Sequence, residues 1–80
     1  MEIHVVSFLK IKPQYKKDFL APLKNISEIR KIQLISGYFD LLIEITVPSS
    51  EDLVPIFENI EKIPGLKEIH SHFVLEVWQK

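Results

Sequence analysis

The first twelve residues carry apolar side chains on both faces of a period-two pattern. The apolar positions are Ile3, Val5, Leu9 and Ile11 on one face and Val6 and Phe8 on the other. Such alternation is typical of a β-strand, and apolar residues on both sides indicate a strand that is covered twice. We predict a strand from Glu2 to Lys12.

A helix is predicted after Pro13, because Tyr15, Phe19 and Leu23 recur at four-residue spacing and form one apolar stripe. Pro22 lies late in this stripe. Proline lacks an N–H and obstructs the preceding turn, so we expect it to kink or shorten the helix.

A second helix is predicted from apolar residues at i, i+3, i+4 and i+7 spacing. These residues are Leu53, Ile56, Phe57 and Ile60. The segment Ser49–Asp52 supplies a capping hydroxyl and acidic side chains for the first turn. Pro55 leaves two starts open. With a cap at Ser50 the proline removes a hydrogen bond, whereas a cap nearer Asp52 places it among donors that are unpaired anyway.

Three further strands complete the pattern. Aliphatic residues among charges favour a strand from Ser27 to Ser36, and a tight turn at residues 36–38 follows. Strict alternation from Phe39 to Val47 predicts the next strand. After Pro64-Gly65, residues Leu66 to Trp78 are expected to form one long last strand.

The predicted order is strand, helix, strand, strand, helix, strand. This order is typical of an α+β, ferredoxin-like βαββαβ fold, in which a four-stranded antiparallel sheet of order 4-1-3-2 carries both helices on one face. Right-handed crossovers leave few alternatives. We therefore expect a single domain over residues 1–80.

One face of this sheet has no helix to cover it. The face expected to meet the helices carries Ile3, Val5, Leu9, Leu41, Ile43, Phe73 and Leu75. The opposite face is expected to carry Val6, Phe8, Leu42, Val74 and Trp78. Large apolar patches on small proteins usually mark interfaces, so we predict a dimer formed through the sheet.

The composition of the chain restricts the classes of function that it can have. The 80 residues are 46% hydrophobic, have a formal net charge of −1 and include no cysteine. The ten Lys and Arg are scattered among eleven Asp and Glu, so no nucleic-acid binding is expected. The chain begins with an amphipathic strand rather than a signal peptide or a membrane span, and we expect a cytoplasmic protein without cofactors.

Catalytic and metal-binding motifs find little support. His4, His70 and His72 share the uncovered face, but antiparallel pairing places His4 far from His72, and no cysteine completes a metal site. There is no phosphate loop and no nucleophile beside a histidine and an acid. We predict that the protein is not an enzyme. The alternative is a small dimeric ferredoxin-like enzyme resembling cofactor-free monooxygenases, which would need a polar pocket between sheet and helices.

A polar cluster is predicted at one end of the sheet. The strand order brings the turn to the start of the last strand, so the cluster comprises Ser36, Gly37, Tyr38, Asp40, His70 and Ser71. Turn amides could bind the carboxylate of a small zwitterion and Asp40 its ammonium. The alternative for Asp40 is a structural hydrogen bond to the turn amides of Gly37 and Tyr38.

The string Ile35-Ser36-Gly37-Tyr38-Phe39-Asp40-Leu41-Leu42 resembles the SGxxDxLL turn of the effector domain in Lrp/AsnC transcription regulators. Ile29 matches a hydrophobic position before that turn. The segment 63–66 is similar to the family's LPGV motif, and 71–75 to its TxxVL segment with serine in place of threonine. Together these cover nearly the whole chain.

This resemblance implies a domain that binds amino acids near Gly37, dimerises, and assembles into an octamer or decamer. Four residues of this chain match positions of the family's motifs, namely Gly37, Tyr38, Asp40 and Ser71. His70 matches a position that varies in the family. Regulators of this family carry a helix-turn-helix ahead of the domain. The chain is therefore expected to lack a DNA-binding domain and to act in transcriptional regulation of amino acid metabolism by binding a metabolite or by co-assembling with full-length relatives.

Overall fold

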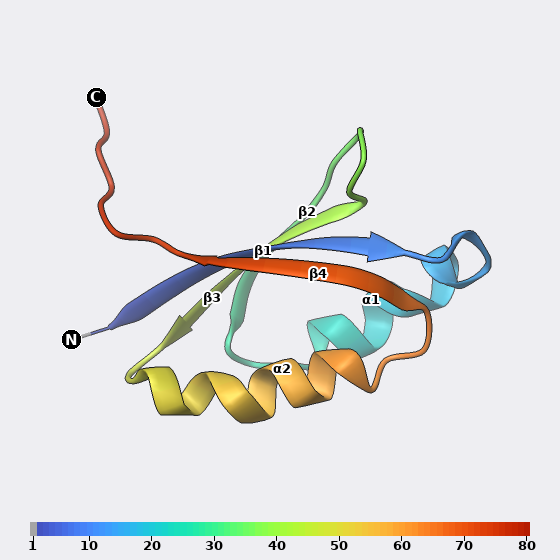
Figure 1. The fold of residues 1–80 in the computed structure, drawn as a ribbon, viewed down its shortest axis with the longest axis horizontal. Coiled ribbons are helices and arrows are strands. Elements are labelled where there is room, and N and C mark those ends of the chain that lie inside the picture. The colour runs from blue at the N-terminus through green and yellow to red at the C-terminus, as the bar shows by residue number, and fades with distance from the viewer. Residues whose placement is uncertain (1) are drawn as a thin grey trace.

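A computed structural model describes residues 2–80 and contains four strands and two α-helices (Figure 1). In chain order they are β1 (Ile3–Ile11), α1 (Lys16–Lys24), β2 (Ile29–Leu34), β3 (Leu41–Val47), α2 (Leu53–Glu61) and β4 (Leu66–Phe73). Short 3-10 turns, Pro13–Tyr15 and Ser50–Asp52, precede the helices. The predicted element order is confirmed.

The four strands form one antiparallel sheet in the order β2-β3-β1-β4, which is the predicted order. Val5 of β1 lies opposite Ile45 of β3 on one side and Phe73 of β4 on the other. Because side chains alternate along a strand, this register places the odd-numbered residues of β1 and β3 on one face. Apart from the partly buried Ile3, those residues are buried, so this face is the inner one.

Both helices lie on the inner face, and Figure 1 shows them below the sheet. The core is made of buried aliphatic residues and one aromatic, namely Val5, Leu9, Ile11, Phe19, Leu23, Leu41, Ile43, Ile45, Val47, Leu53, Ile56, Ile60 and Ile63. Phe19 and Leu23 come from the stripe predicted for the first helix. The ferredoxin-like α+β fold is thus confirmed, since the periodicities of strands and helices direct their apolar residues to one interior.

The two prolines are accommodated at opposite ends of their helices. Pro22 lies inside α1, which ends two residues later at Lys24, so the helix is short as expected. Ser49 and Asp52 form a capping box around the 3-10 turn that precedes α2. Pro55 is then the third residue of α2, where its missing N–H removes no α-helical hydrogen bond.

The last strand is shorter than predicted. It ends at Phe73 instead of Trp78, and residues 74–80 form no regular structure and rise from the sheet on the side away from the helices (Figure 1). The reason is register: the amide of Val74 donates to the carbonyl of His4, close to the start of β1, so β1 offers few further partners. Phe73 lies on the inner face as expected, since it pairs with Val5 and shares a hollow with Leu53 of α2, although its side chain is 57% exposed. Leu75 lies beyond the strand and is 95% exposed, so its predicted place against the helices is wrong.

Candidate functional site

Asp40 anchors the turn between β2 and β3 to the rest of the molecule. Its carboxylate oxygen Oδ2 accepts a 2.8 Å hydrogen bond from the backbone N–H of Ile11, and Oδ1 lies 3.0 Å from the ammonium of Lys16. The Ile11 hydrogen bond, followed by Lys16, holds the pKa of Asp40 below its ordinary value. The carboxylate therefore stays ionised at neutral pH and fixes the turn to β1 and α1.

Several backbone N–H groups of the turn have no hydrogen-bond partner within the described residues. Ile35 and Asp40 close it through a 3.0 Å hydrogen bond, and Gly37 adopts a φ of 120° that favours glycine. Within residues 2–80, the amides of residues 36–39 form no hydrogen bond. The alternative role of Asp40, a bond to the amides of Gly37 and Tyr38, is therefore not what this chain shows. Consecutive free N–H groups in a turn are suited to binding an anion.

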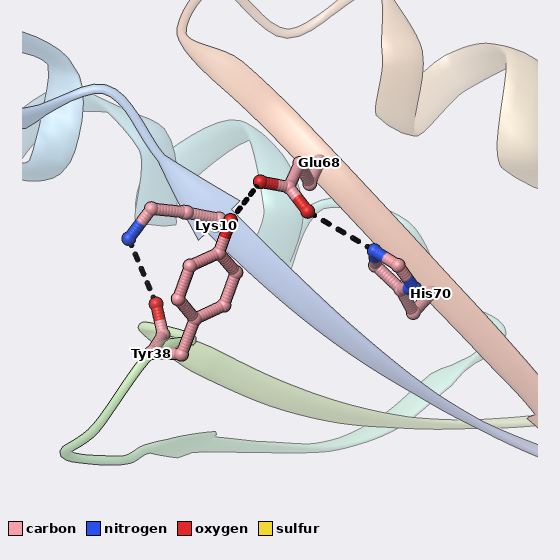
Figure 2. A network of polar contacts seen from close by, with 4 residues as sticks. All are labelled: Lys10, Tyr38, Glu68 and His70. Atoms are coloured by element: carbon pink, nitrogen blue, oxygen red, sulfur yellow. Dashed lines mark hydrogen bonds and ion pairs between the residues drawn. The ribbon is translucent and has the colours of Figure 1, made fainter.

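Tyr38 connects the turn to β4 across the outer face of the sheet (Figure 2). Its hydroxyl donates to Glu68, and the other oxygen of Glu68 lies 3.1 Å from Nε2 of His70. The ammonium of Lys10 donates to the Tyr38 carbonyl at 2.8 Å and lies 4.3 Å from the centre of its ring. The Glu68 hydrogen bond raises the pKa of Tyr38 and, reciprocally, lowers the pKa of Glu68. The sequence did not predict Lys10 or Glu68 as part of this site.

Ser71 lies apart from this group. It pairs with Ser7 of β1, and the two hydroxyl oxygens are 2.7 Å apart on the inner face, where Ser7 is fully buried. His70 pairs with Phe8 and therefore faces outward. The structure thus brings Tyr38 and His70 together through Glu68 and leaves Ser71 on the other side of the sheet. Alternation along β4 separates these sequence neighbours.

A pocket that the sequence did not indicate opens on the inner side of the Asp40 turn. It has a volume of about 210 Å³ and is lined by residues of α1, β1, β2, β3 and the β2–β3 turn: Ile11, Lys16, Phe19, Leu20, Leu34, Ile35, Asp40 and Leu41. Its residues come from several segments, which no local pattern links. Leu34, which lines this pocket, is 73% exposed on the edge strand β2.

The outer face carries a small apolar centre within a polar rim. Val6, Phe8 and Leu42 are partly buried, as is Val74 at the end of the sheet, whereas Trp78 lies in the C-terminal segment and is 76% exposed. Phe39 extends this centre, with its ring centroid 5.6 Å from that of Phe8. Aromatic stacking of this kind gives the centre a defined shape.

The three histidines lie on the outer face as predicted. The predicted wide separation of His4 from His72 is wrong, because His72 pairs with Val6 and the amide of Val74 donates to the carbonyl of His4, which places the two histidines two positions apart on neighbouring strands. In residues 2–80 no group of three or more His, Asp or Glu side chains is arranged to hold a metal ion. Over the same range, no helix is long and apolar enough to cross a membrane.

The interior between sheet and helices is almost entirely apolar in the part of the chain that the structure describes. Among the described residues, Ser7 is the only polar residue in the buried set, and its hydroxyl is already paired. The fold is a βαββαβ domain with an exposed turn that Asp40 anchors to β1 and α1.

Sequence comparison identifies the family. Residues 4–80 match the Lrp/AsnC ligand binding domain, and the chain belongs to that family, which supplies effector-binding domains to transcription regulators. No curated protein matches the sequence significantly.

Solved structures share the fold at low sequence identity. Escherichia coli AsnC has a TM-score of 0.86 and 16% identity over 98% of this chain and 55% of its own. A Neisseria meningitidis regulator in complex with L-Met has a TM-score of 0.86 and 16% identity, covering 98% and 53%. A Thermus thermophilus protein reaches 0.87 at 10% identity, covering 98% and 99%. The chain spans about half the length of the two regulators.

Proposed function

We propose that this chain binds a free amino acid at the turn formed by residues 36–40 and assembles into homo-oligomers through its outer face. The observation that carries the proposal is the turn itself, which Asp40 fixes in place while four consecutive amides remain free of partners within the described chain. A preorganised set of N–H donors binds a carboxylate with little ordering cost.

The ammonium of the amino acid would be bound by the carboxylate of Asp40. Asp40 uses one lone pair on each oxygen, so it can accept a further hydrogen bond from a ligand ammonium. Tyr38 and His70 flank the turn on the outer face through Glu68, and Ser71 would contribute only from the opposite face or from another copy. The Neisseria regulator, whose complex holds L-Met, supports an amino acid as the ligand class.

Assembly is supported by the outer face. Val6, Phe8, Leu42 and Phe39 form an apolar centre that the helices leave uncovered, and Val74 and Trp78 lie in the segment that leaves the sheet beside it. A chain of 80 residues gains stability by burying such a surface against a second copy. Octamers or decamers of this dimer, and mixed assemblies with full-length Lrp/AsnC regulators in the cytoplasm, would couple the ligand to transcription of amino-acid metabolism genes.

The first experiment measures mass in solution by light scattering or native mass spectrometry, with and without a panel of amino acids. We expect an assembly whose mass or melting temperature responds to one amino acid. Leu42→Arg, on the outer face, should dissociate the assembly, whereas Val54→Arg, on exposed α2 surface, should not. A wild-type monomer indifferent to every amino acid would refute the proposal and favour the enzyme alternative.

A second experiment tests the ligand site. Asp40→Asn should weaken binding of the responding amino acid at least tenfold, whereas Asp18→Asn, in the exposed first turn of α1, should leave it unchanged. Equal affinities for both variants would place the ligand away from the turn.

A further inference from the structure

We propose that the pocket between α1 and the β2–β3 edge is a second ligand site, and that it binds a small aliphatic monocarboxylate through Lys16. This site goes beyond the amino-acid site proposed for the turn, because it opens on the inner side of Asp40 and involves none of the free turn amides. Its ligand would be an acid with a short hydrocarbon chain and no second charge.

The pocket is built for a hydrocarbon chain. Apart from Lys16 and Asp40, every lining residue is aliphatic or aromatic: Ile11, Phe19, Leu20, Leu34, Ile35 and Leu41. Its volume of about 210 Å³ is the room of about seven water molecules, close to the size of a short fatty acid. Water in such a pocket finds few hydrogen-bond partners, so its replacement by a hydrocarbon is favourable.

Leu34 leaves one apolar side of the pocket exposed to water. It belongs to β2, the edge strand on the α1 side, and is 73% exposed although its neighbours in the pocket Phe19 and Leu41 are buried. The register places it opposite Leu41, so it is on the inner face at a point that α1 does not cover. A hydrocarbon chain in the pocket would shield this side chain from water.

The pocket carries a positioned cation at its rim. The ammonium of Lys16 has three N–H donors and lies 3.0 Å from Oδ1 of Asp40. Asp40 is itself held by the N–H of Ile11, so it fixes Lys16 beside the apolar lining while leaving donors for a ligand carboxylate. A ligand ammonium that approached Lys16 rather than Asp40 would meet a like charge.

A matched set of ligands tests this chemistry. Hexanoate, hexylamine and norleucine share a linear six-carbon skeleton and differ in carrying a carboxylate, an ammonium or both. The three are titrated into uniformly labelled protein, and the methyl NMR signals of Leu20, Leu34 and Ile35 are followed. We expect hexanoate to shift these signals saturably, with an affinity at least tenfold higher than that of either other ligand.

Variants then locate the site. Lys16→Met should weaken hexanoate binding at least tenfold, and Leu20→Trp, which fills the pocket, should abolish it. Lys17→Met is the matched control, since its side chain does not line the pocket, and should bind as the wild type does. Thermal melts establish that each variant is folded, and Leu34→Asp, at an exposed position, repeats the test should Leu20→Trp fail to fold.

Three results would overturn the proposal: no methyl shift with hexanoate, equal affinities for hexanoate and hexylamine, or Lys16→Met binding as tightly as Lys17→Met. Tighter binding of norleucine than of hexanoate would also overturn it, by making the pocket part of the amino-acid site. These outcomes concern pocket methyl groups alone. They are therefore independent of whether amino acids change the assembly.

Discussion

Replacing Asp40 with alanine removes the acceptor that anchors the β2–β3 turn to the end of β1. The N–H of Ile11 then loses its partner in a residue that is only 3% exposed, and Lys16 loses its ion pair. We expect Asp40→Ala to lower the free energy of unfolding.

The two interactions contribute unequally. A hydrogen bond to a charged group contributes about 1.5–3 kcal/mol, whereas an ion pair with an exposed lysine contributes roughly 0.2–1 kcal/mol. The side chain of Lys16 is 55% exposed, which places its ion pair in the weaker range. Asp40→Ala should therefore cost about 2 kcal/mol and Lys16→Met roughly 0.5 kcal/mol. Asp40→Asn retains an acceptor oxygen without its charge, and should cost about 1 kcal/mol.

Urea unfolding at one fixed protein concentration measures these costs, because assembly makes stability concentration-dependent. With a slope of roughly 1 kcal/mol/M for so small a domain, the midpoint for Asp40→Ala should fall by roughly 2 M. A lowered pKa in the folded state stabilises the protein above the unfolded-state pKa of about 3.9. The advantage of wild type over Asp40→Asn should thus be constant near neutral pH and vanish as pH falls through the lowered pKa of Asp40.

Two results would refute this reasoning. If Lys16→Met were as destabilising as Asp40→Ala, the ion pair rather than the Ile11 hydrogen bond would anchor the turn. If the difference between wild type and Asp40→Asn persisted after the pH had fallen through the lowered pKa of Asp40, its origin would not be the ionised carboxylate.

Other positions give further expected outcomes. Gly37 and Gly65 both have positive φ, but a Cβ at Gly65 would overlap a neighbouring side chain, so thermal melts should show Gly65→Ala to be more destabilising than Gly37→Ala. Ser71→Ala should cost more than Ser7→Ala, about 1–3 against under 1 kcal/mol in urea unfolding, because it leaves the buried Ser7 hydroxyl without a partner. Trp78 is the only tryptophan, so its emission should move to shorter wavelength as concentration rises if assembly covers it, and an unchanged spectrum in a confirmed oligomer would exclude it from the interface.

The sequence by itself determined the fold. Period-two alternation in β1 and β3 and the four-residue spacing in α1 assign each apolar residue to a face, and only a few arrangements bury them all. The glycine turn at Gly37 was predicted as well, because turn preferences depend on adjacent residues. The sequence left the cap of the second helix open between Ser50 and a residue nearer Asp52, and the N-cap of α2 is Asp52. The family was apparent from the motif around that turn.

Tertiary structure decided what depends on register and on contacts between distant segments. β4 stops at Phe73 because its pairing reaches the start of β1, a limit that the apolar pattern through Trp78 does not reveal. Ser71 and His70 were predicted as one cluster, yet alternation places them on opposite faces once Ser7 fixes the register. The partners of Asp40 are Ile11 and Lys16, 29 residues away in the first case, and no local pattern specifies such a contact. Local physics therefore sets the elements, whereas their mutual packing sets the site.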